Sequence, residues 1–459
     1  MSAFTRLANG RPAATRPLVA LAASGQLGYG IPEAALKAGL ARAPDFIGCD
    51  MGSVDPGPYY LGSGKMATND EMTRRDLRLV ILGARRLDAP LLLGTAGTAG
   101  ANPHLEATLA MVREIAREER LHFRLASIQA DVPPSLVAEA QARGRLTPLG
   151  RIPDPSSDDI ARSRIVAQMG VEAFTRALEG GADVVIAGRA CDTAIFAAIP
   201  QMLGYPTALA MHMAKIIECT SICCAPGGRD AILGYLDRDS FVLDSMNPER
   251  HATPTSVAAH SLYEQADPFS VAEPDGILHL DDARYEALDA HRTRVSGAQW
   301  EKASRLRVKI EGALLEGQRS VLMAGSADPH VIDRIEPILA AVETTTRNLF
   351  QKPFRLFPRV YGRGAVSLSP RRGLEQPSEI FILVECVADD QSTAIGALTV
   401  FKQYLLHHGF AGRLSTGGNI AFPITPPELS AAEAYRFSLY HLMEVDDLAG
   451  LFPIQFENL

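Results

Sequence analysis

Short apolar runs alternate with longer amphipathic stretches through the first half of the chain. Five runs have the length and apolar character of strands: 17–23, 44–50, 90–94, 122–131 and 182–188. Apolar residues recur with helical spacing in four stretches between these runs: 32–42, 70–89, 105–120 and 159–181. Uninterrupted apolar strands are typical of parallel sheets that helices cover on both faces. The pattern therefore predicts a mostly parallel, doubly wound α/β domain.

Beyond about Trp300 the pattern changes to that of an α+β layer. Strands are expected over 305–314, 319–325, 378–390 and 436–445, and helices over 330–350 and 392–408. We therefore predict a core domain over 1–300 and a smaller α+β domain over 301–459.

The N-terminal residues are basic and precede the apolar run at 17–23, an order that imitates a signal peptide. A small-residue turn and a helical pattern follow at once, which favours a first strand instead. No run reaches the roughly 18 apolar residues of a membrane span. The expectation is a cytoplasmic protein with no membrane contact.

Composition limits the classes of molecule that the protein is expected to bind. The chain has 459 residues, a formal net charge of -8 and no evident basic face, which disfavours nucleic acid. The six cysteines lack the spacing of a disulfide framework or a zinc site, including the group at 219–224 near His212 and Glu218. Reduced thiols are expected, and a homo-oligomer is the default assumption that no residue pattern decides.

Ligands of open parallel sheets bind outside the carboxyl ends of the strands. The polar and small residues that directly follow the predicted strands are Ser24 and Gly25, Asp50 and Asp55, Thr95 to Gly100, Asp131, and Gly188 to Asp192. The fold would gather these groups at one edge, where we expect the site.

The turn at 94–104, "GTAGTAGANPH", precedes a predicted helix. The backbone amides and hydroxyls of Thr95, Gly97 and Thr98 could cradle a carboxylate or phosphate there. The alternative is a tight turn in which the glycines only relieve steric crowding. The turn matches neither a Walker loop nor a dinucleotide fingerprint, so hydride transfer is not favoured.

The segment "GRACD" at 188–192 brings three reactive groups together. Arg189 could bind a carboxylate bidentately, Asp192 could act as general acid or base, and Cys191 could act as a nucleophile. The structural alternatives are that Asp192 caps a helix, Arg189 pairs with it, and Cys191 fills the core.

Asp50 and Asp55 belong to a loop long enough to act as a lid. Two carboxylates could hold a divalent metal ion or divide acid and base roles, although aspartates also form ordinary turns. His260 and Glu264 are spaced for one helical face, as a surface pair would be, and the glycine turn at 414–420 could reach across a cleft or merely reverse the chain.

Four segments carry a family resemblance: "GGADVVIAGRACDTA" (180–194), "HMAKIIEC" (212–219), "SLYEQADPFSVAEPD" (261–275) and "RTRVSGA" (292–298). In this order they resemble the acyclic terpene utilisation (AtuA-like) family. One departure is at 22–30, where the glycine-rich opening of the family carries an arginine and this chain has none. The resemblance implies catabolism of acyclic terpenoids or related branched acids, often beside acyl-CoA enzymes.

The leading hypothesis is an enzyme that abstracts a proton next to a carbonyl: a lyase, hydratase or isomerase acting on a branched carboxylic or hydroxy acid or its acyl-CoA thioester. Arg189 and the Thr95–Thr98 turn would hold the acid group, and Asp192, Asp50 or Asp55 would move the proton. A divalent ion could stabilise the intermediate, although no residue requires one.

The rival hypothesis is a non-catalytic acyl-CoA or carboxylate-binding subunit of a carboxylase-type complex. An apolar pocket with arginines and no perturbed acid–base pair would favour it. A third hypothesis is hydrolysis through Cys191.

Overall fold

The computed structural model describes residues 1–10, 16–263, 267–366, 377–413 and 419–459. The chain forms two compact units. The first unit comprises Met1–Leu314 and Phe437–Leu459, and the second comprises Leu315–Arg436. The sequence predicts a single boundary near residue 300, whereas the end of the chain returns to the first unit.

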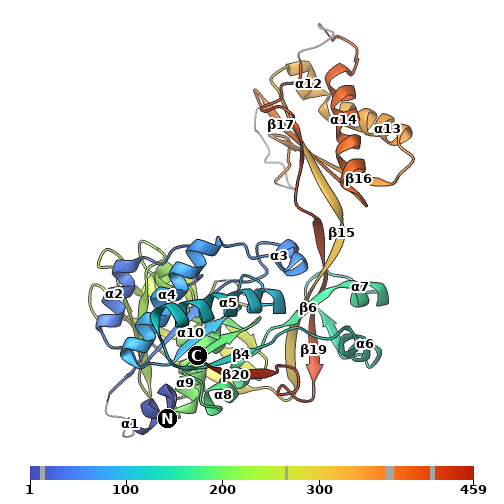
Figure 1. Ribbon diagram of the computed structural model, residues 1–459. Coiled ribbons are helices and arrows are strands. Elements are labelled where there is room, and N and C mark those ends of the chain that lie inside the picture. The colour runs from blue at the N-terminus through green and yellow to red at the C-terminus, as the bar shows by residue number, and fades with distance from the viewer. Residues whose placement is uncertain (11–15, 264–266, 367–376, 414–418) are drawn as a thin grey trace. The chain divides into compact units, whose positions relative to one another are not determined.

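The main sheet belongs to the first unit (Figure 1). In the described part of the chain its strands run in the order β12 (Arg284–Ala287), β13 (Thr293–Ser296), β9 (Ser240–Ser245), β8 (Ile232–Leu236), β1 (Leu18–Ala22), β2 (Phe46–Asp50), β3 (Leu91–Gly94), β7 (Val184–Ala187), β4 (Arg124–Ile128) and β20 (Ile454–Asn458). The central strands β1, β2, β3, β7 and β4 are parallel, and these are the five strands that the apolar runs predict. Strands β8 and β20 flank them in antiparallel orientation.

Helices of the first unit connect and cover this sheet. They are α1 (Ala3–Gly10), α2 (Glu33–Ala41), α3 (Pro58–Ser63), α4 (Asp70–Leu87), α5 (Asn102–Glu119), α6 (Pro134–Ala142), α7 (Ser157–Arg162), α8 (Val171–Glu179), α9 (Asp192–Met202), α10 (Thr207–Ile217), the 3₁₀ turn η1 (Thr220–Cys223) and α11 (Pro254–Ser261).

The central strands of the sheet are buried on both faces. Along β1, Leu18, Ala20 and Ala22 pack in one hydrophobic cluster with α8, α9 and α10. The alternate residues Val19 and Leu21 pack in another cluster with α2, α4 and α5. This alternation follows from the two-residue period of a strand and confirms the doubly wound α/β class.

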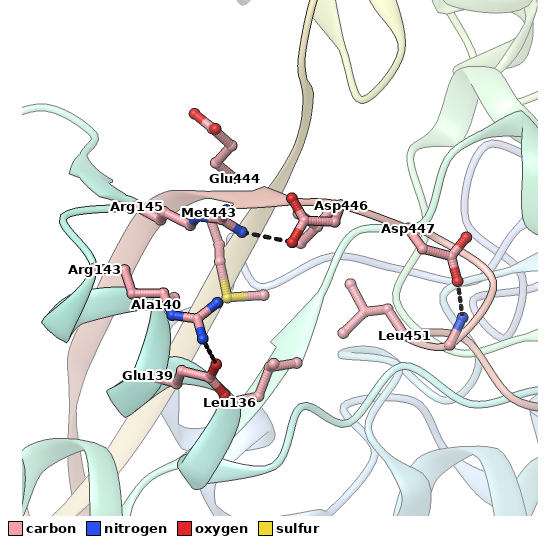
Figure 2. Close-up of a pocket in the computed structure, with 12 residues that line it drawn as sticks. Leu136, Glu139, Ala140, Arg143, Arg145, Met443, Glu444, Asp446, Asp447 and Leu451 are labelled. Atoms are coloured by element: carbon pink, nitrogen blue, oxygen red, sulfur yellow. Dashed lines mark hydrogen bonds and ion pairs between the residues drawn. The ribbon is translucent and has the colours of Figure 1, made fainter.

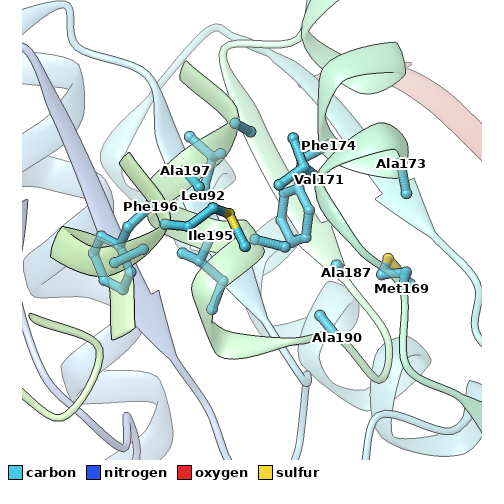
Figure 3. Packing of buried hydrophobic residues seen from close by; sticks show 14 of the residues in the cluster. Leu92, Met169, Val171, Ala173, Phe174, Ala187, Ala190, Ile195, Phe196 and Ala197 are labelled. Carbon is cyan, nitrogen blue, oxygen red and sulfur yellow. The ribbon is translucent and has the colours of Figure 1, made fainter. Parts of the chain in front are cut away.

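Helix α9 packs very closely on the sheet. A Cβ atom at Gly48 of β2 would lie 2.3 Å from the Phe196 ring, and one at Gly94 of β3 would lie 2.5 Å from Ile195. Figure 3 shows Phe196 and Ile195 beside Leu92 of β3. The two glycines therefore let α9, whose first residue is Asp192, lie directly on the strands.

One predicted helix is wrong in part. The stretch 159–181 contains strand β6 (Arg164–Ala167) between α7 and α8, because these residues pair with Ile310 to Ala313. The two strands expected at 305–314 and 319–325 are a single strand, β15 (Leu306–Ser326). The remaining strands of this unit are β5 (Leu146–Pro148), which pairs with β19 (Ala434–Val445), and the small sheet of β10 (Ser270–Glu273), β11 (Gly276–His279) and β14 (Gln299–Lys302).

The second unit has the predicted α+β character. Its antiparallel strands are the later part of β15, β16 (Phe354–Tyr361), β17 (Ile380–Ala388) and β18 (Glu428–Ser430). Its helices are α12 (Pro329–Asp333), α13 (Ile335–Leu349) and α14 (Gln391–His407), and α13 and α14 share one hydrophobic cluster with β16 and β17.

None of the helices in the described ranges combines the length and the apolar character needed to cross a bilayer.

Candidate functional site

A polar pocket of about 200 Å³ lies beyond the carboxyl ends of β1 and β2. Its lining residues are Gly25, Gln26, Asp50, Gly52, Ser53, Asp55, Asp192, Glu218, Cys219, Thr220, Ile222 and Arg229. Four carboxyl groups therefore meet in one small space, contributed by the end of β2, the loop that follows it, the start of α9 and the end of α10. We call it the carboxyl pocket.

Asp50 is the last residue of β2 and is buried. Its Oδ2 accepts a hydrogen bond from the Gly52 amide at 3.0 Å, whereas its buried Oδ1 has no partner among the described residues. Burial and the neighbouring Asp192 and Glu218 raise the pKa of Asp50 well above its usual range. These surroundings therefore favour the protonated form of Asp50 over the charged form, relative to an exposed aspartate.

Asp192 opens α9, but it does not cap the helix, because Cys191 occupies the N-cap position. The buried Oδ1 of Asp192 also has no partner in the described chain. Burial and the adjacent Glu218 carboxyl raise the pKa of Asp192 well above its usual range. Glu218 itself is buried and accepts a hydrogen bond from Lys215 Nζ at 2.7 Å.

Thr220 adds a strained residue to the wall. Its φ is 55°, a left-handed conformation that costs a β-branched residue of order 1–3 kcal/mol. Its hydroxyl oxygen is buried and unpartnered among the described residues. Buried polar atoms are nearly always hydrogen-bonded, so three unpartnered atoms on one pocket (of Asp50, Asp192 and Thr220) point to a ligand-binding role.

Arg189 forms a buried ion pair within the protein. Its Nε and a terminal nitrogen donate to the two carboxylate oxygens of Glu311 at 2.7 and 3.1 Å, and Lys309 approaches the same carboxylate at 3.0 Å. The Arg189 and Glu311 side chains are 4% and 0% exposed. Arg189 is expected from the sequence to bind the carboxylate of a ligand with this bidentate geometry. The carboxylate that it binds is instead that of Glu311, on β15. Arg189 does not line the carboxyl pocket.

The turn after β3 is likewise occupied by contacts within the chain. Thr95 Oγ1 accepts a hydrogen bond from the Ala190 amide at 3.2 Å, and Thr98 Oγ1 accepts one from the Ala67 amide at 2.8 Å. A Cβ at Gly97 would lie 2.8 Å from His104, and one at Gly188 would lie 2.6 Å from the Gly100 carbonyl. These residues hold neighbouring strand ends together and lie outside the pocket lining.

Of the other residues named from sequence, Gly25, Asp50, Asp55 and Asp192 line the pocket together. Ser24 is buried next to it, where its Oγ accepts from the Gln26 amide at 3.2 Å. The sequence does not predict that Glu218, Thr220 and Arg229 line this pocket, because none of them directly follows a predicted strand. Glu264 and residues 414–418 lie outside the described residues.

A second acidic group adjoins Asp192 along α9. Thr193 Oγ1 donates to Glu273 Oε1 at 2.6 Å, and the Cys191 thiol also donates to Glu273. Burial raises the pKa of Glu273 to about 7. Burial and Glu273 raise the pKa of Cys191 well above its usual range, which opposes formation of the thiolate that a nucleophile requires.

We expect Glu273→Gln to gain stability over the wild type as the pH rises from about 4.5 to 7. A carboxyl whose pKa is raised in the folded state stabilises fully below its unfolded pKa and loses that contribution as the pH rises through the folded pKa. The shift corresponds to roughly 3 kcal/mol at most, and partial exposure reduces it to about 1–2 kcal/mol.

Urea unfolding of both proteins at pH 5 and pH 8 measures this difference. Glu301→Gln is the control, because the Glu301 side chain is 67% exposed. Equal pH dependence of wild type and Glu273→Gln would contradict the expectation.

Another pocket, of about 330 Å³, lies between α6 and the segment after β19. Figure 2 shows two ion pairs within its lining. Arg145 lies 2.8 Å from Asp446, and Arg143 lies 2.7 Å from Glu139. None of the unpartnered buried atoms found in the described chain belongs to its lining. We therefore take the smaller carboxyl pocket as the candidate site.

A model of the family described as "Acyclic terpene utilisation family protein AtuA" matches residues 96–228 and 240–427. The chain belongs to the acyclic terpene utilisation family. The matched residues include Asp192, Glu218 and Glu311, whereas Asp50 and Asp55 precede them. Comparisons with curated proteins and with solved structures gave no match. Membership implies a role in the catabolism of acyclic terpenes.

Within the described residues, no group of three or more histidine, cysteine, aspartate or glutamate side chains is arranged to hold a metal ion. None of the six cysteines, all of which lie in the described residues, forms a disulfide.

Proposed function

We propose that this protein is a catabolic enzyme that moves a proton next to the carbonyl of a branched acyl thioester, in the lyase, hydratase or isomerase class. One observation carries the proposal: Asp50 and Asp192, both with raised pKa values, line one pocket with Glu218. Adjacent carboxyls in a buried site take different protonation states, which is the arrangement that acid–base catalysis needs.

The roles follow from the surroundings of each group. The Asp192–Glu218 pair beside Lys215 holds a negative charge and accepts the proton from the carbon next to the carbonyl. The electron pair of the broken C–H bond moves onto the carbonyl oxygen. The protonated Asp50 donates a hydrogen bond to that oxygen and stabilises the enolate.

The lining favours a thioester over a free acid. A free carboxylate would meet Asp50, Asp55, Asp192 and Glu218, whereas a thioester carbonyl is neutral. Arg229, the cationic residue of the lining, is exposed and stacks on the Tyr29 ring at 5.4 Å. It is placed to contact an anionic part of the substrate outside the pocket, such as the phosphates of coenzyme A.

The rival function, a non-catalytic binding subunit, would be supported by an apolar pocket with available arginines. The carboxyl pocket is instead polar, and Arg189 is bound to Glu311. A cytoplasmic location and a homo-oligomeric state remain parts of the proposal. The former is supported by the lack of disulfides among the six described cysteines.

Proton exchange in D₂O tests the proposal. The protein would be incubated with saturated branched acyl-CoA thioesters and with the corresponding free acids, and mass spectrometry would follow deuterium at the carbon next to the carbonyl. We expect the wild type to incorporate deuterium into the thioesters. The Asp50→Asn/Asp192→Asn double variant should not catalyse this incorporation. Binding of thioesters without exchange would favour the binding subunit instead.

A further inference from the structure

An apolar hollow adjoins the carboxyl pocket. Its volume is about 410 Å³, and its lining consists of Val54, Asp55, Ile152, Phe437 and Tyr440. All of these residues belong to the first unit. Asp55 lines both spaces, so the hollow and the carboxyl pocket lie on either side of one short loop segment.

Apart from Asp55, the residues that line the hollow are apolar or aromatic. Phe437 packs on a small hydrophobic cluster that includes Val54 and Ala313. The rings of Phe437 and Tyr440 lie 6.3 Å apart, and Lys309 Nζ is 4.4 Å from the centre of the Tyr440 ring. Lys309 also contacts Glu311, so this ammonium group is already paired, and Asp55 is the charged residue of the lining.

The sizes of the two spaces complement each other. Pockets for organic ligands typically measure roughly 300–1,000 Å³. The carboxyl pocket, at about 200 Å³, falls below this range and has room for a head group only. The neighbouring hollow, at about 410 Å³, is apolar where the carboxyl pocket is polar.

We propose that the hollow is a subsite for the aliphatic acyl chain of the substrate, which runs past Asp55 while its carbonyl lies in the carboxyl pocket. The inference rests on the proposed function for the position of the carbonyl. It assigns the substrate to acyl thioesters with an extended aliphatic chain, and it gives Ile152, Phe437 and Tyr440 the role of selecting chain length.

Binding of a chain-length series tests the subsite. The probes are straight-chain acyl-CoAs from acetyl-CoA to decanoyl-CoA, and isothermal titration calorimetry with the full chain measures the Kd. We expect about three- to fourfold tighter binding for each methylene that enters the hollow. Ile152→Trp places a bulky indole in the path of the acyl chain and should abolish this gain for the longer chains while leaving acetyl-CoA binding within about twofold.

The matched control is Leu136→Trp, which adds the same bulk to the other pocket and should keep the full gain. Ile152→Asp is the second variant, and its charge should likewise abolish the gain. Thermal unfolding midpoints check that each variant is folded.

The outcomes separate the subsite from the proposed function. A chain-length gain lost in both Ile152 variants supports the subsite, whether or not D₂O exchange occurs. A gain that persists in both folded variants, or no gain in the wild type, overturns the subsite. Exchange on acetyl-CoA in that case would leave the proposed proton transfer intact.

Discussion

Asp192→Asn should lower the rate of proton exchange next to the thioester carbonyl by about 10²–10⁴-fold. The amide keeps the size and one oxygen of the carboxyl, but it neither accepts the proton nor shares one with Glu218. Deuterium incorporation followed by mass spectrometry measures the rate. The Kd for the thioester should change little, because the substitution removes proton transfer rather than volume.

The same variant should also be more stable than the wild type as the pH rises. Because the pKa of Asp192 is raised in the folded state, its stabilising contribution is present below the unfolded pKa and is lost as the pH rises toward the folded value. Asparagine has no such loss, so the difference in unfolding free energy should grow with pH.

Asp55→Asn is the matched control, because Asp55 lines the same pocket but is exposed. It should retain exchange within about threefold. Equal exchange rates in wild type and Asp192→Asn would remove Asp192 from the mechanism.

Glu311→Ala should cost about 3–5 kcal/mol of unfolding free energy, since it leaves the buried Arg189 guanidinium without its carboxylate. Chemical unfolding monitored by circular dichroism measures the loss. Because Arg189 joins the end of β7 to β15, the damage should extend to the turn that positions Asp192.

Lys309→Ala provides the comparison, because the Lys309 side chain is 24% exposed and is the weaker partner of Glu311. We expect a loss of about 1 kcal/mol. The double substitution Arg189→Met/Glu311→Leu should recover much of the stability, as apolar replacements of buried ion pairs often do. A loss under 1 kcal/mol in Glu311→Ala would contradict a buried, fully committed pair.

The parallel core could be predicted because each of its strands is a short apolar run with a helix pattern behind it. Strand β6 could not, since Arg164–Ala167 continues an apparent helix, and its ladder partners are the distant residues Ile310 to Ala313. Local periodicity contains no information about such distant pairing. For the same reason, the sequence pattern predicts two strands where the structure has the single long strand β15.

The site followed from topology in part. Asp50 and Asp192 are adjacent to strand ends, and the rule for open sheets brings them together. Glu218 follows a helix rather than a strand, and Glu311 lies on β15 about 120 residues after Arg189. Only the folded chain shows that Arg189, expected to bind the carboxylate of a substrate, binds the carboxylate of Glu311 instead.

The close packing of α9 on Gly48 and Gly94 affects how natural and selected variants should be interpreted. A methyl group at either glycine would push the helix outward, and Asp192 would move with the end of that helix. Such a protein could retain every polar group of the pocket and its reduced cysteines, yet hold the proton acceptor too far from its target. Loss of turnover in a mutational screen should therefore map to these two apolar positions as well as to the carboxylates.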